Sequence, residues 1–278
     1  PNCTQKIAQT LGVAASFCGG LTQFFHSGST VKRLHAAQAA SSGVRAALLV
    51  EAGFDGPMDI LEGKDGFFKA YSDTLNMDLL LNGLGSHFET AGVSIKPHAS
   101  SARVLSAIEA ASRFVQTPGF DATQIERIDL GVPQVIFGRL TSNNPKDTQA
   151  AQMSSPFCVA LALHLKKTVN ESINIDDFEN HIEDPLVREL CSKVHCYLDD
   201  EVEGTSTQES VSAKLTLTLR DKSSSVQFVQ APMGSATRPY TLQNHVDKLS
   251  RELCTRMSAQ EAQGFIDQVL NFQDRKHL

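Results

Sequence analysis

The stretch VKRLHAAQAASSGVRAALLVEAG at residues 31–53 decides how the first part of the chain folds. Residues 34–52 are dense in alanine, so little side chain is present to hold a neighbouring helix away. Gly53 is a natural C-terminal stop, and Asp55-Gly56-Pro57 marks a turn. The pattern predicts one long helix that packs tightly against other helices and is buried.

Working outward from this helix, the first ninety residues have the composition of a helical domain. Residues 5–25 before it are apolar and interrupted by glycine. After it, residues 58–61 are expected to begin a short helix, and residues 77–81 (MDLLL) are expected to lie in the core. No strand pattern interrupts this part of the chain.

The middle of the chain has the patterns of a mixed α and β region. Residues 124–135 alternate apolar and polar side chains, as strands do, and residues 213–219 and 226–229 predict a β-hairpin. Ser100 or Ser101 is a candidate N-cap for a helix through Phe114. The further expected helices are residues 150–165, a helix that starts at Asp184-Pro185, and two amphipathic helices at residues 241–256 and 260–271.

Composition excludes several functions. The chain has 278 residues, and 25 Lys and Arg against 31 Asp and Glu give a net charge of −6, which argues against a nucleic-acid-binding surface. No run approaches the roughly 20 apolar residues that a membrane span needs. We therefore expect no nucleic-acid and no membrane partner, and a cytoplasmic location, with mitochondria as the alternative.

The six cysteines predict neither disulfides nor a metal site. They are scattered and form no CxxC pair. The nearest approach to a metal cluster is Cys191, His195 and Cys196, in which Cys191 and His195 would share a face at helical spacing, but no second ligand pair is visible. We expect no metal.

Two lysine-containing segments carry possible chemistry. Lys32 and Arg33 stand at the start of the alanine-rich helix, where the helix dipole disfavours cations unless an anion lies among them. The alternative is a solvated charged pair ahead of a core helix. In residues 95–101 (IKPHASS), Lys96 ends an extended segment and hydroxyl groups begin the next helix, although serine at this place is often only a cap.

Taken together, the segments resemble the MmgE/PrpD family, which includes 2-methylcitrate dehydratases, cis-aconitate decarboxylases and iminodisuccinate epimerases. Residues 31–43 are similar to its KRLH-x-G-x-AA-x-x-G block, and residues 95–98 with 108–110 are similar to its K-P-x-x-x-C…IDA segment. Further similar blocks follow the family's order: GFDGP at 53–57, ILEG at 60–63, GFF at 66–68, AQMSSPFCVA at 151–160 and APMG at 231–234.

The resemblance implies a mainly α protein with an α+β part. A helical domain, expected to be incomplete at its N-terminal side, would stand beside an α+β lid, with the active site between them and no cofactor. We expect residues 1–91 to form the second half of the helical domain, residues 92–237 the lid, and residues 238–278 helices that return to the helical domain. The resemblance also implies a homodimer.

Family enzymes move a proton next to a carboxylate of a small di- or tricarboxylate. Lys32 matches the pocket lysine and Lys96 the lysine at the start of the lid, so the resemblance implies that both are catalytic. Fixed cations stabilise the negative charge that builds on the carboxylate in the transition state. The remaining expected substrate-binding residues are Arg33, His35, Ser101 and Gln152.

The sequence also departs from the family pattern. Ser101 stands where the family has Cys or His, Phe157 replaces a tyrosine, and Leu105 replaces a histidine. The family's aspartate and two further histidines belong to an N-terminal portion that has no equivalent here. Three readings therefore stay open: a lyase or epimerase, a truncated or degenerate homologue that keeps an anion-binding pocket without catalysis, and a helical interaction protein with no pocket.

Overall fold

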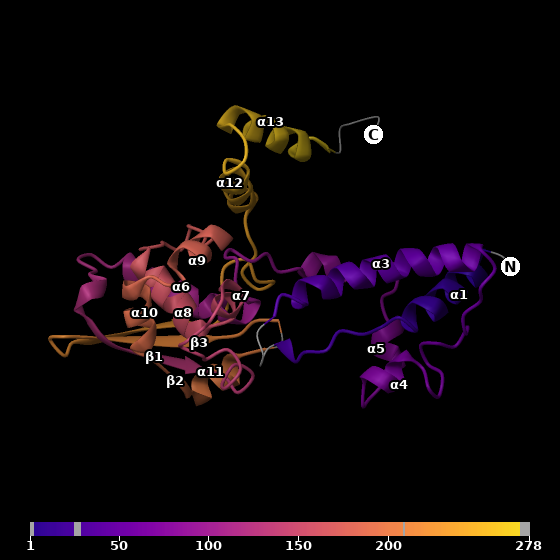
Figure 1. Ribbon diagram of the computed structural model, residues 1–278, viewed down its shortest axis with the longest axis horizontal. Helices are drawn as coiled ribbons and strands as arrows, with labels where there is room; N and C mark the ends of the chain where they lie inside the picture. Colours follow the sequence, from indigo (N-terminus) through magenta and orange to yellow (C-terminus); the bar gives the residue numbers. More distant parts are fainter. Residues whose placement is uncertain (1–2, 25–28, 208, 273–278) are drawn as a thin grey trace. The chain divides into compact units, whose positions relative to one another are not determined.

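The computed structural model describes residues 3–24, 29–207 and 209–272. The chain divides between Glu89 and Thr90 into two compact units, which we call unit 1 and unit 2 (Figure 1). A short 3₁₀ helix, η1 (Glu89–Gly92), lies at the division. The described residues combine mainly helices with one mixed sheet, which confirms the predicted combination of helical and α+β parts at this coarse level.

Unit 1 is built on two helices that pack together, α1 and the alanine-rich α3 (Figure 1). Its described helices are α1 (Cys3–Ala15), α3 (Lys32–Glu51), α4 (Phe67–Tyr71) and α5 (Met77–Leu81). Small residues permit close packing at one point. A Cβ atom on Gly12 of α1 would lie 2.6 Å from the carbonyl oxygen of Pro57, and one on Gly56 would lie 2.4 Å from that of Gln9. The predicted turn therefore packs directly against the α1 backbone.

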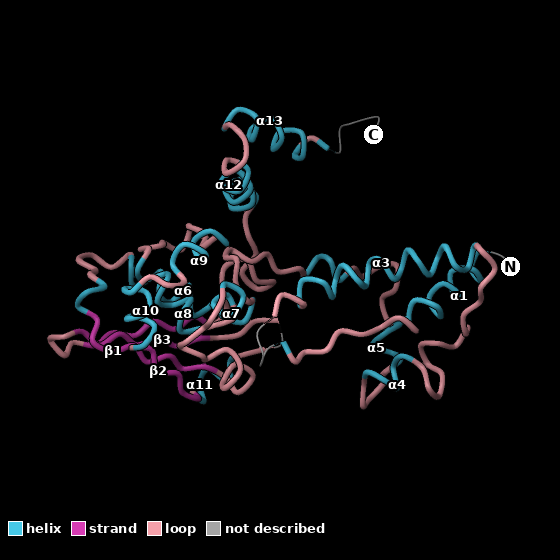
Figure 2. The backbone as a smooth tube through the Cα atoms, in the orientation of Figure 1, coloured by secondary structure: helices cyan, strands magenta, loops and turns pink. Residues whose placement is uncertain are grey.

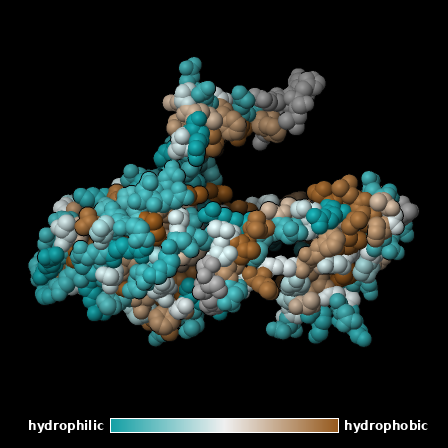
Figure 3. Space-filling view, in the orientation of Figure 1, coloured by the Kyte–Doolittle hydropathy of each residue, from teal (hydrophilic) through white to brown (hydrophobic). Residues whose placement is uncertain are grey.

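The predicted burial of the alanine-rich helix is found along one stripe only. Within α3 the buried residues are Ser42, Ala46 and Val50, spaced four apart, as expected for the line that contacts α1. Apolar side chains on its other faces, such as Val44 and Leu48, are more than 60% exposed. Figure 3 shows this hydrophobic surface over the α1 and α3 part of unit 1. Alanine allows close approach of neighbours but does not supply them.

Two smaller predictions for unit 1 are wrong. Residues 58–61 form turns rather than the start of a helix, because the chain folds back and the amide of Phe67 donates to the carbonyl of Ile60. The expected core segment at residues 77–81 is a helix, α5, but it has no buried residue, and Leu79 is 79% exposed. An apolar run in the sequence can indicate a helix, but it does not show whether another part of the protein buries that helix.

Unit 2 is organised around a four-stranded sheet in the order β2-β1-β3-β4 (Figure 2). Strand β1 pairs in parallel with β2, with Ile128 opposite Val194, while the β1–β3 and β3–β4 pairs are antiparallel. The predicted hairpin is confirmed as β3–β4, with Ala213 opposite Val229. The strands are β1 (Ile125–Val132), β2 (Val194–Leu198), β3 (Ala213–Leu219) and β4 (Ser224–Val229).

Helices α6 and α8 pack against this sheet and form the core with it (Figure 1). Strand β3 alternates buried and half-buried residues, which places Ala213, Leu215 and Leu217 on the covered face. Helix α8 is buried over residues 155–163, which accounts for its lack of an amphipathic pattern. The elements of this layer are η2 (Ala102–Val104), α6 (Leu105–Val115), η3 (Ala122–Gln124), α7 (Thr148–Gln152), α8 (Ser155–His164), α9 (Ile175–His181), α10 (Pro185–Ser192) and α11 (Asp200–Thr205).

The predicted helix at residues 150–165 is divided into α7 and α8. Helix α7 ends at Gln152, and Ser154 caps α8, since its hydroxyl oxygen accepts from the Phe157 amide at 3.0 Å. Pro156 in the first turn of α8 suits a helix start. The break matters because it leaves Gln152 at the end of α7, beside the Lys96 segment.

The C-terminal part holds the two predicted amphipathic helices, α12 (Leu242–Leu253) and α13 (Ala259–Leu270). Both begin with a capping box, formed by Thr241 with Asn244 and by Ser258 with Glu261. That residues 238–278 return to the helical domain stays a prediction, as does the lid role of residues 92–237.

Candidate functional site

The expected site residues fall into both units, and the unit 1 group lies at and after the start of α3. Lys32 and Arg33 form its first turn and are exposed. That turn contains no acidic residue, and Val31, at the N-cap position, makes no side-chain capping hydrogen bond. Two cations thus stand where the backbone amides already carry partial positive charge. This is an arrangement that favours an anion.

His35 lies one helical turn after Lys32 on α3 and lines a cavity within unit 1. It is half-buried and its ring meets Phe24 edge-on, with the centroids 5.7 Å apart. It lines a cavity of about 500 Å³ together with Gln38 and Ser42, whose side chains are joined by a 3.0 Å hydrogen bond. The rest of the lining is mostly apolar or glycine: Leu11, Ala14, Ala15, Phe17, Cys18, Gly19, Gly20, Ala39, Gly43, Leu61, Phe67 and Tyr71.

Among the described residues that line this cavity none is a lysine or arginine, so they do not supply the fixed positive charge that a polycarboxylate requires. The cationic groups of unit 1 that suit a carboxylate are instead Lys32 and Arg33, one turn or less before His35. The KRLH block therefore divides into a charged surface part and a half-buried histidine.

The unit 2 group forms one connected turn around Lys96. The Nζ atom of Lys96 donates to the carbonyl oxygen of Ser100 at 3.0 Å, and the amide of Ser101 donates to the carbonyl of Gln152 at 3.0 Å. The Gln152 side chain returns to the same turn, because its Nε2 donates to the Ala99 carbonyl at 2.5 Å. The structure therefore brings Lys96, Ser101 and Gln152 together.

Within this turn, Ser101 and Gln152 hold backbone groups. Ser101 is buried, and its hydroxyl oxygen caps η2 by accepting from the Arg103 amide at 3.3 Å. Gln152 uses its amide nitrogen on Ala99. Lys96 is the exposed residue of the group. The geometry supports a binding cation at Lys96 on a turn that Ser101 and Gln152 position.

His98 is a buried residue that links the Lys96 turn to Ile173. It is 4% exposed, and its Nδ1 accepts from the Ile173 amide at 3.1 Å, while the Ala99 amide donates to the Ile173 carbonyl at 2.8 Å. Burial, with smaller contributions from Lys248 and Lys167, lowers the pKa of His98 from 6.5 to about 3. The ring is therefore neutral at physiological pH and acts as a hydrogen-bond acceptor.

Gly234 holds the other side of the Lys96 turn. The Ile95 amide donates to the Gly234 carbonyl at 2.7 Å. Gly234 has φ +86°, and a Cβ atom there would lie 2.0 Å from the Ile95 carbonyl oxygen, so only glycine fits. The APMG segment at residues 231–234 thus fixes the residue directly before Lys96.

The APMG segment is itself held by a buried carboxylate, that of Glu109 on α6. Glu109 is 4% exposed and accepts from the Met233 amide at 2.8 Å. It also pairs with Arg113 at 2.7 Å and Arg238 at 2.9 Å. Sequence reasoning missed this cluster, although a glutamate within the apolar pattern of α6 was a signal for it.

The positions where the sequence departs from the family pattern are buried. Phe157 is fully buried and stacks on Phe178 with the ring centroids 6.2 Å apart, and Leu105 is 5% exposed. At these positions the chain therefore supplies packing rather than acid–base groups.

The structure does not bring Cys191, His195 and Cys196 together on one helix face. Helix α10 ends at Ser192 and β2 begins at Val194, so Cys191 and His195 do not share a helix face. Cys191 is buried and its thiol donates to the Asn143 carbonyl at 3.3 Å, whereas His195 is exposed. Burial raises the pKa of both the Cys191 and the Cys196 thiols to about 12, so neither is a ready thiolate ligand.

Comparison with family models decides the family. The model for the MmgE/PrpD N-terminal domain matches residues 3–80, and the model for the MmgE/PrpD C-terminal domain matches residues 98–274. The chain belongs to the MmgE/PrpD family. No curated protein matches it. The two matched ranges lie one in each unit of this MmgE/PrpD chain, and the predicted resemblance is confirmed.

Membership in the MmgE/PrpD family indicates an enzyme of the dehydratase, other lyase or epimerase type that acts on small carboxylates. Lys32 and Arg33 lie within the first match, and Gln152 within the second; Lys96 lies just before it. None of the helices in the described part of the chain is both long and apolar enough to cross a membrane.

Proposed function

We propose that this MmgE/PrpD chain is a lyase or epimerase that removes a proton next to a carboxylate of a small di- or tricarboxylate, without a cofactor. The observation that carries the proposal is that two exposed lysines, Lys32 and Lys96, lie on segments whose local structure favours an anion or fixes the lysine backbone. Lys32 stands with Arg33 in a helix turn that has no acidic residue, and Lys96 stands on a turn that Gly234, Gln152 and His98 hold.

The two lysines supply the charges that this chemistry needs. Breaking a C–H bond next to a carboxylate moves negative charge onto that group, and a fixed ammonium stabilises the charge more in the transition state than in the ground state. We assign one lysine to the carboxylate whose charge grows, and the other to the transfer of the proton. Arg33 and His35 are assigned to the remaining polar groups of the substrate.

The hydrogen bonds of the Lys96 turn support the proposal that Lys96 is positioned in advance for binding the substrate. Its hydrogen bonds are made by the protein itself, so the lysine is positioned before a ligand arrives. A cation that needs no reorganisation contributes more to catalysis than one that must be ordered on binding. Ser101 and Gln152 are therefore positioning residues in this proposal.

A second function is favoured by a specific observation, the buried apolar side chains at two expected acid–base positions, Phe157 and Leu105. A homologue with these residues could keep the carboxylate-binding lysines and have no catalytic turnover. Both functions require an anion site, and they differ in whether a proton moves.

Binding of tricarboxylates tests the anion site that the two functions share. We expect citrate or cis-aconitate to raise the melting temperature of the wild-type chain, and Lys96→Ala to abolish this shift. Lys222→Ala is the matched control, since Lys222 is an exposed lysine of unit 2 that pairs with Glu126 at 2.6 Å. A shift of equal size in the wild type and in the Lys32→Ala, Lys96→Ala double variant would contradict the site assignment.

A further inference from the structure

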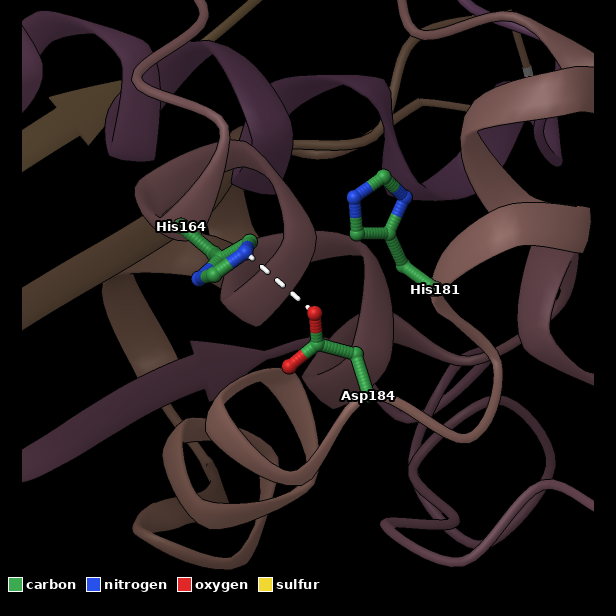
Figure 4. Close-up of side chains that lie close together, drawn as sticks. All are labelled: His164, His181 and Asp184. Carbon is green, nitrogen blue, oxygen red and sulfur yellow. Dashed lines mark ion pairs between the residues drawn. The ribbon is translucent and has the colours of Figure 1, made fainter.

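Three side chains that ligate metals meet where α8, α9 and α10 come together in unit 2 (Figure 4). His164 is the last residue of α8, His181 is the last residue of α9, and Asp184 is the N-cap of α10. One ligating atom from each lies within 4.8 Å of the other two. The Nε2 atom of His164 is 3.6 Å from the Oδ2 atom of Asp184, and the two imidazole centroids are 5.7 Å apart.

The hydrogen bonds of His181 leave one nitrogen available for an ion. Its Nδ1 lies 2.8 Å from the carbonyl oxygen of Asp177, one helical turn earlier. Because a carbonyl oxygen can only accept, Nδ1 carries the hydrogen, and in the neutral ring the lone pair is then on Nε2. A backbone carbonyl that orients the non-ligating nitrogen is the usual support of a metal-binding histidine.

Asp184 is oriented in the same way by the backbone. Its Oδ1 accepts from the amides of Leu186 at 2.8 Å and Val187 at 3.3 Å. The other oxygen, Oδ2, is the one nearest His164. Each oxygen of this carboxylate therefore has its own role, one as a helix cap and one directed toward the imidazoles.

The surroundings suit a cation. His164 and His181 each end a helix, where backbone carbonyls carry partial negative charge. The neighbouring cationic side chains are already paired, Lys167 with Asp177 at 3.5 Å and Arg188 with Glu183 at 3.3 Å. All three ligating residues are half-buried, so the ligands are partly ordered by packing and still reachable from solvent.

We propose that His164, His181 and Asp184 form a binding site for a divalent first-row transition-metal ion, with Zn²⁺ as the ion. Two imidazoles and one carboxylate favour zinc over Mg²⁺ or Ca²⁺, which prefer oxygen ligands throughout. Ligand atoms at about 2.1 Å from a tetrahedral zinc lie about 3.4 Å from one another. The side chains must therefore close by at most about 1.4 Å, which rotation about their own bonds can provide. Three protein ligands leave the fourth position for water.

The bound ion would fasten together three helix ends. Helix α8 begins just after Gln152, and α9 begins just after Ile173, and both of these residues hold the Lys96 turn. Binding of the ion by these three side chains does not require that the chain be catalytic. Sequence reasoning missed the site because His164 is 17 positions from His181, and only the His181-x-x-Asp184 spacing is local.

The test is titration of the chelator-treated chain with Zn²⁺ by calorimetry, and with Co²⁺ by absorption. We expect one saturable Zn²⁺ per chain, and a rise in melting temperature on the order of 5 °C at a hundredfold excess over Kd. His181→Gln and Asp184→Asn should each weaken binding at least about tenfold. Asparagine can still cap α10, so the second variant removes the ligand charge while it keeps the helix start. His195→Gln, at an exposed histidine of β2, should bind as the wild type does.

Two results would overturn the proposal. One is the absence of saturable binding, or binding that neither variant weakens. The other is a cobalt spectrum with the intense charge-transfer absorption of thiolate ligands, which would show that exposed cysteines such as Cys3, Cys18 or Cys254 take the ion instead. If Asp184→Asn fails to fold, His181→Gln decides the question by itself.

Discussion

Replacing Glu109 with glutamine probes the buried cluster that supports the Lys96 turn. The carboxylate is 4% exposed and accepts from three groups, the Met233 amide and the guanidinium groups of Arg113 and Arg238. Glutamine has nearly the same shape, but it offers one acceptor oxygen and brings an NH₂ group of its own. At least one of the three donors must then face another donor.

The magnitude follows from burial. Removing one partner from a buried ion pair costs about 3–5 kcal/mol. Here the side chains of Arg113 and Arg238 are 34% and 39% exposed, so water takes up part of their lost interaction. We therefore expect Glu109→Gln to lower the free energy of unfolding by about 2–4 kcal/mol.

The matched control is Glu126→Gln. Glu126 also pairs with a cation, Lys222, at 2.6 Å, but the two side chains are 43% and 72% exposed. An exposed pair contributes about 0–1 kcal/mol, so the control should change stability by less than about 1 kcal/mol. Urea unfolding followed by far-UV circular dichroism measures both, since the chain has no tryptophan for fluorescence. Equal losses in the two variants would refute the reasoning from burial.

Three further outcomes are expected. His98 has a pKa of about 3 in the folded chain and 6.5 in the unfolded chain, so the unfolded chain binds a proton and stability falls as the pH drops from 6.5 towards 3. Between pH 7 and pH 5 the loss of unfolding free energy should be about 2 kcal/mol larger in the wild type than in His98→Asn. Urea unfolding at both pH values measures this difference, and equal pH dependence of the two proteins would contradict it. Gly234→Ala should displace the Ile95–Lys96 backbone because its Cβ has no space, and should abolish the tricarboxylate-induced melting shift, whereas Gly264→Ala, where a Cβ meets nothing within 4 Å, should leave the shift unchanged. Gln152→Ala removes the hydrogen bond to the Ala99 carbonyl and should weaken citrate binding in calorimetry by about tenfold or less, a loss that Gln152→Glu, which has no N–H to donate, should reproduce.

Local signals explain which elements of the fold the sequence predicted. The β3–β4 hairpin alternates over a short turn, and α10 begins with Asp184-Pro185, so both elements could be predicted from neighbouring residues. Strand β2 was missed because VHCYL is short and its parallel pairing with β1 is created by the tertiary fold. The exposure of α5 was missed because periodicity says nothing about the covering surface.

The candidate site was predictable to a similar extent. Motif resemblance indicated Lys32 and Lys96 as candidates, because each belongs to a contiguous segment, and their catalytic role stays a prediction. The supports of Lys96 could not be found in this way, since Gly234 and Ile95, or Glu109 and Met233, are more than a hundred positions apart in sequence. Ser101 and Gln152 were expected to bind substrate, and the structure shows both holding backbone groups of the turn.

Hydrogen exchange at the carbon next to a carboxylate tests most directly whether this MmgE/PrpD chain performs the proposed chemistry. Proton NMR in D₂O would follow the loss of C–H signals from a panel of small di- and tricarboxylates incubated with the chain. We expect exchange in one member of the panel with the wild type and with Lys64→Ala, an exposed lysine of unit 1, and none with Lys32→Ala or Lys96→Ala. Exchange that persists when Lys32 and Lys96 are both alanine would contradict the central claim. Tricarboxylate binding without any exchange would establish the non-catalytic alternative.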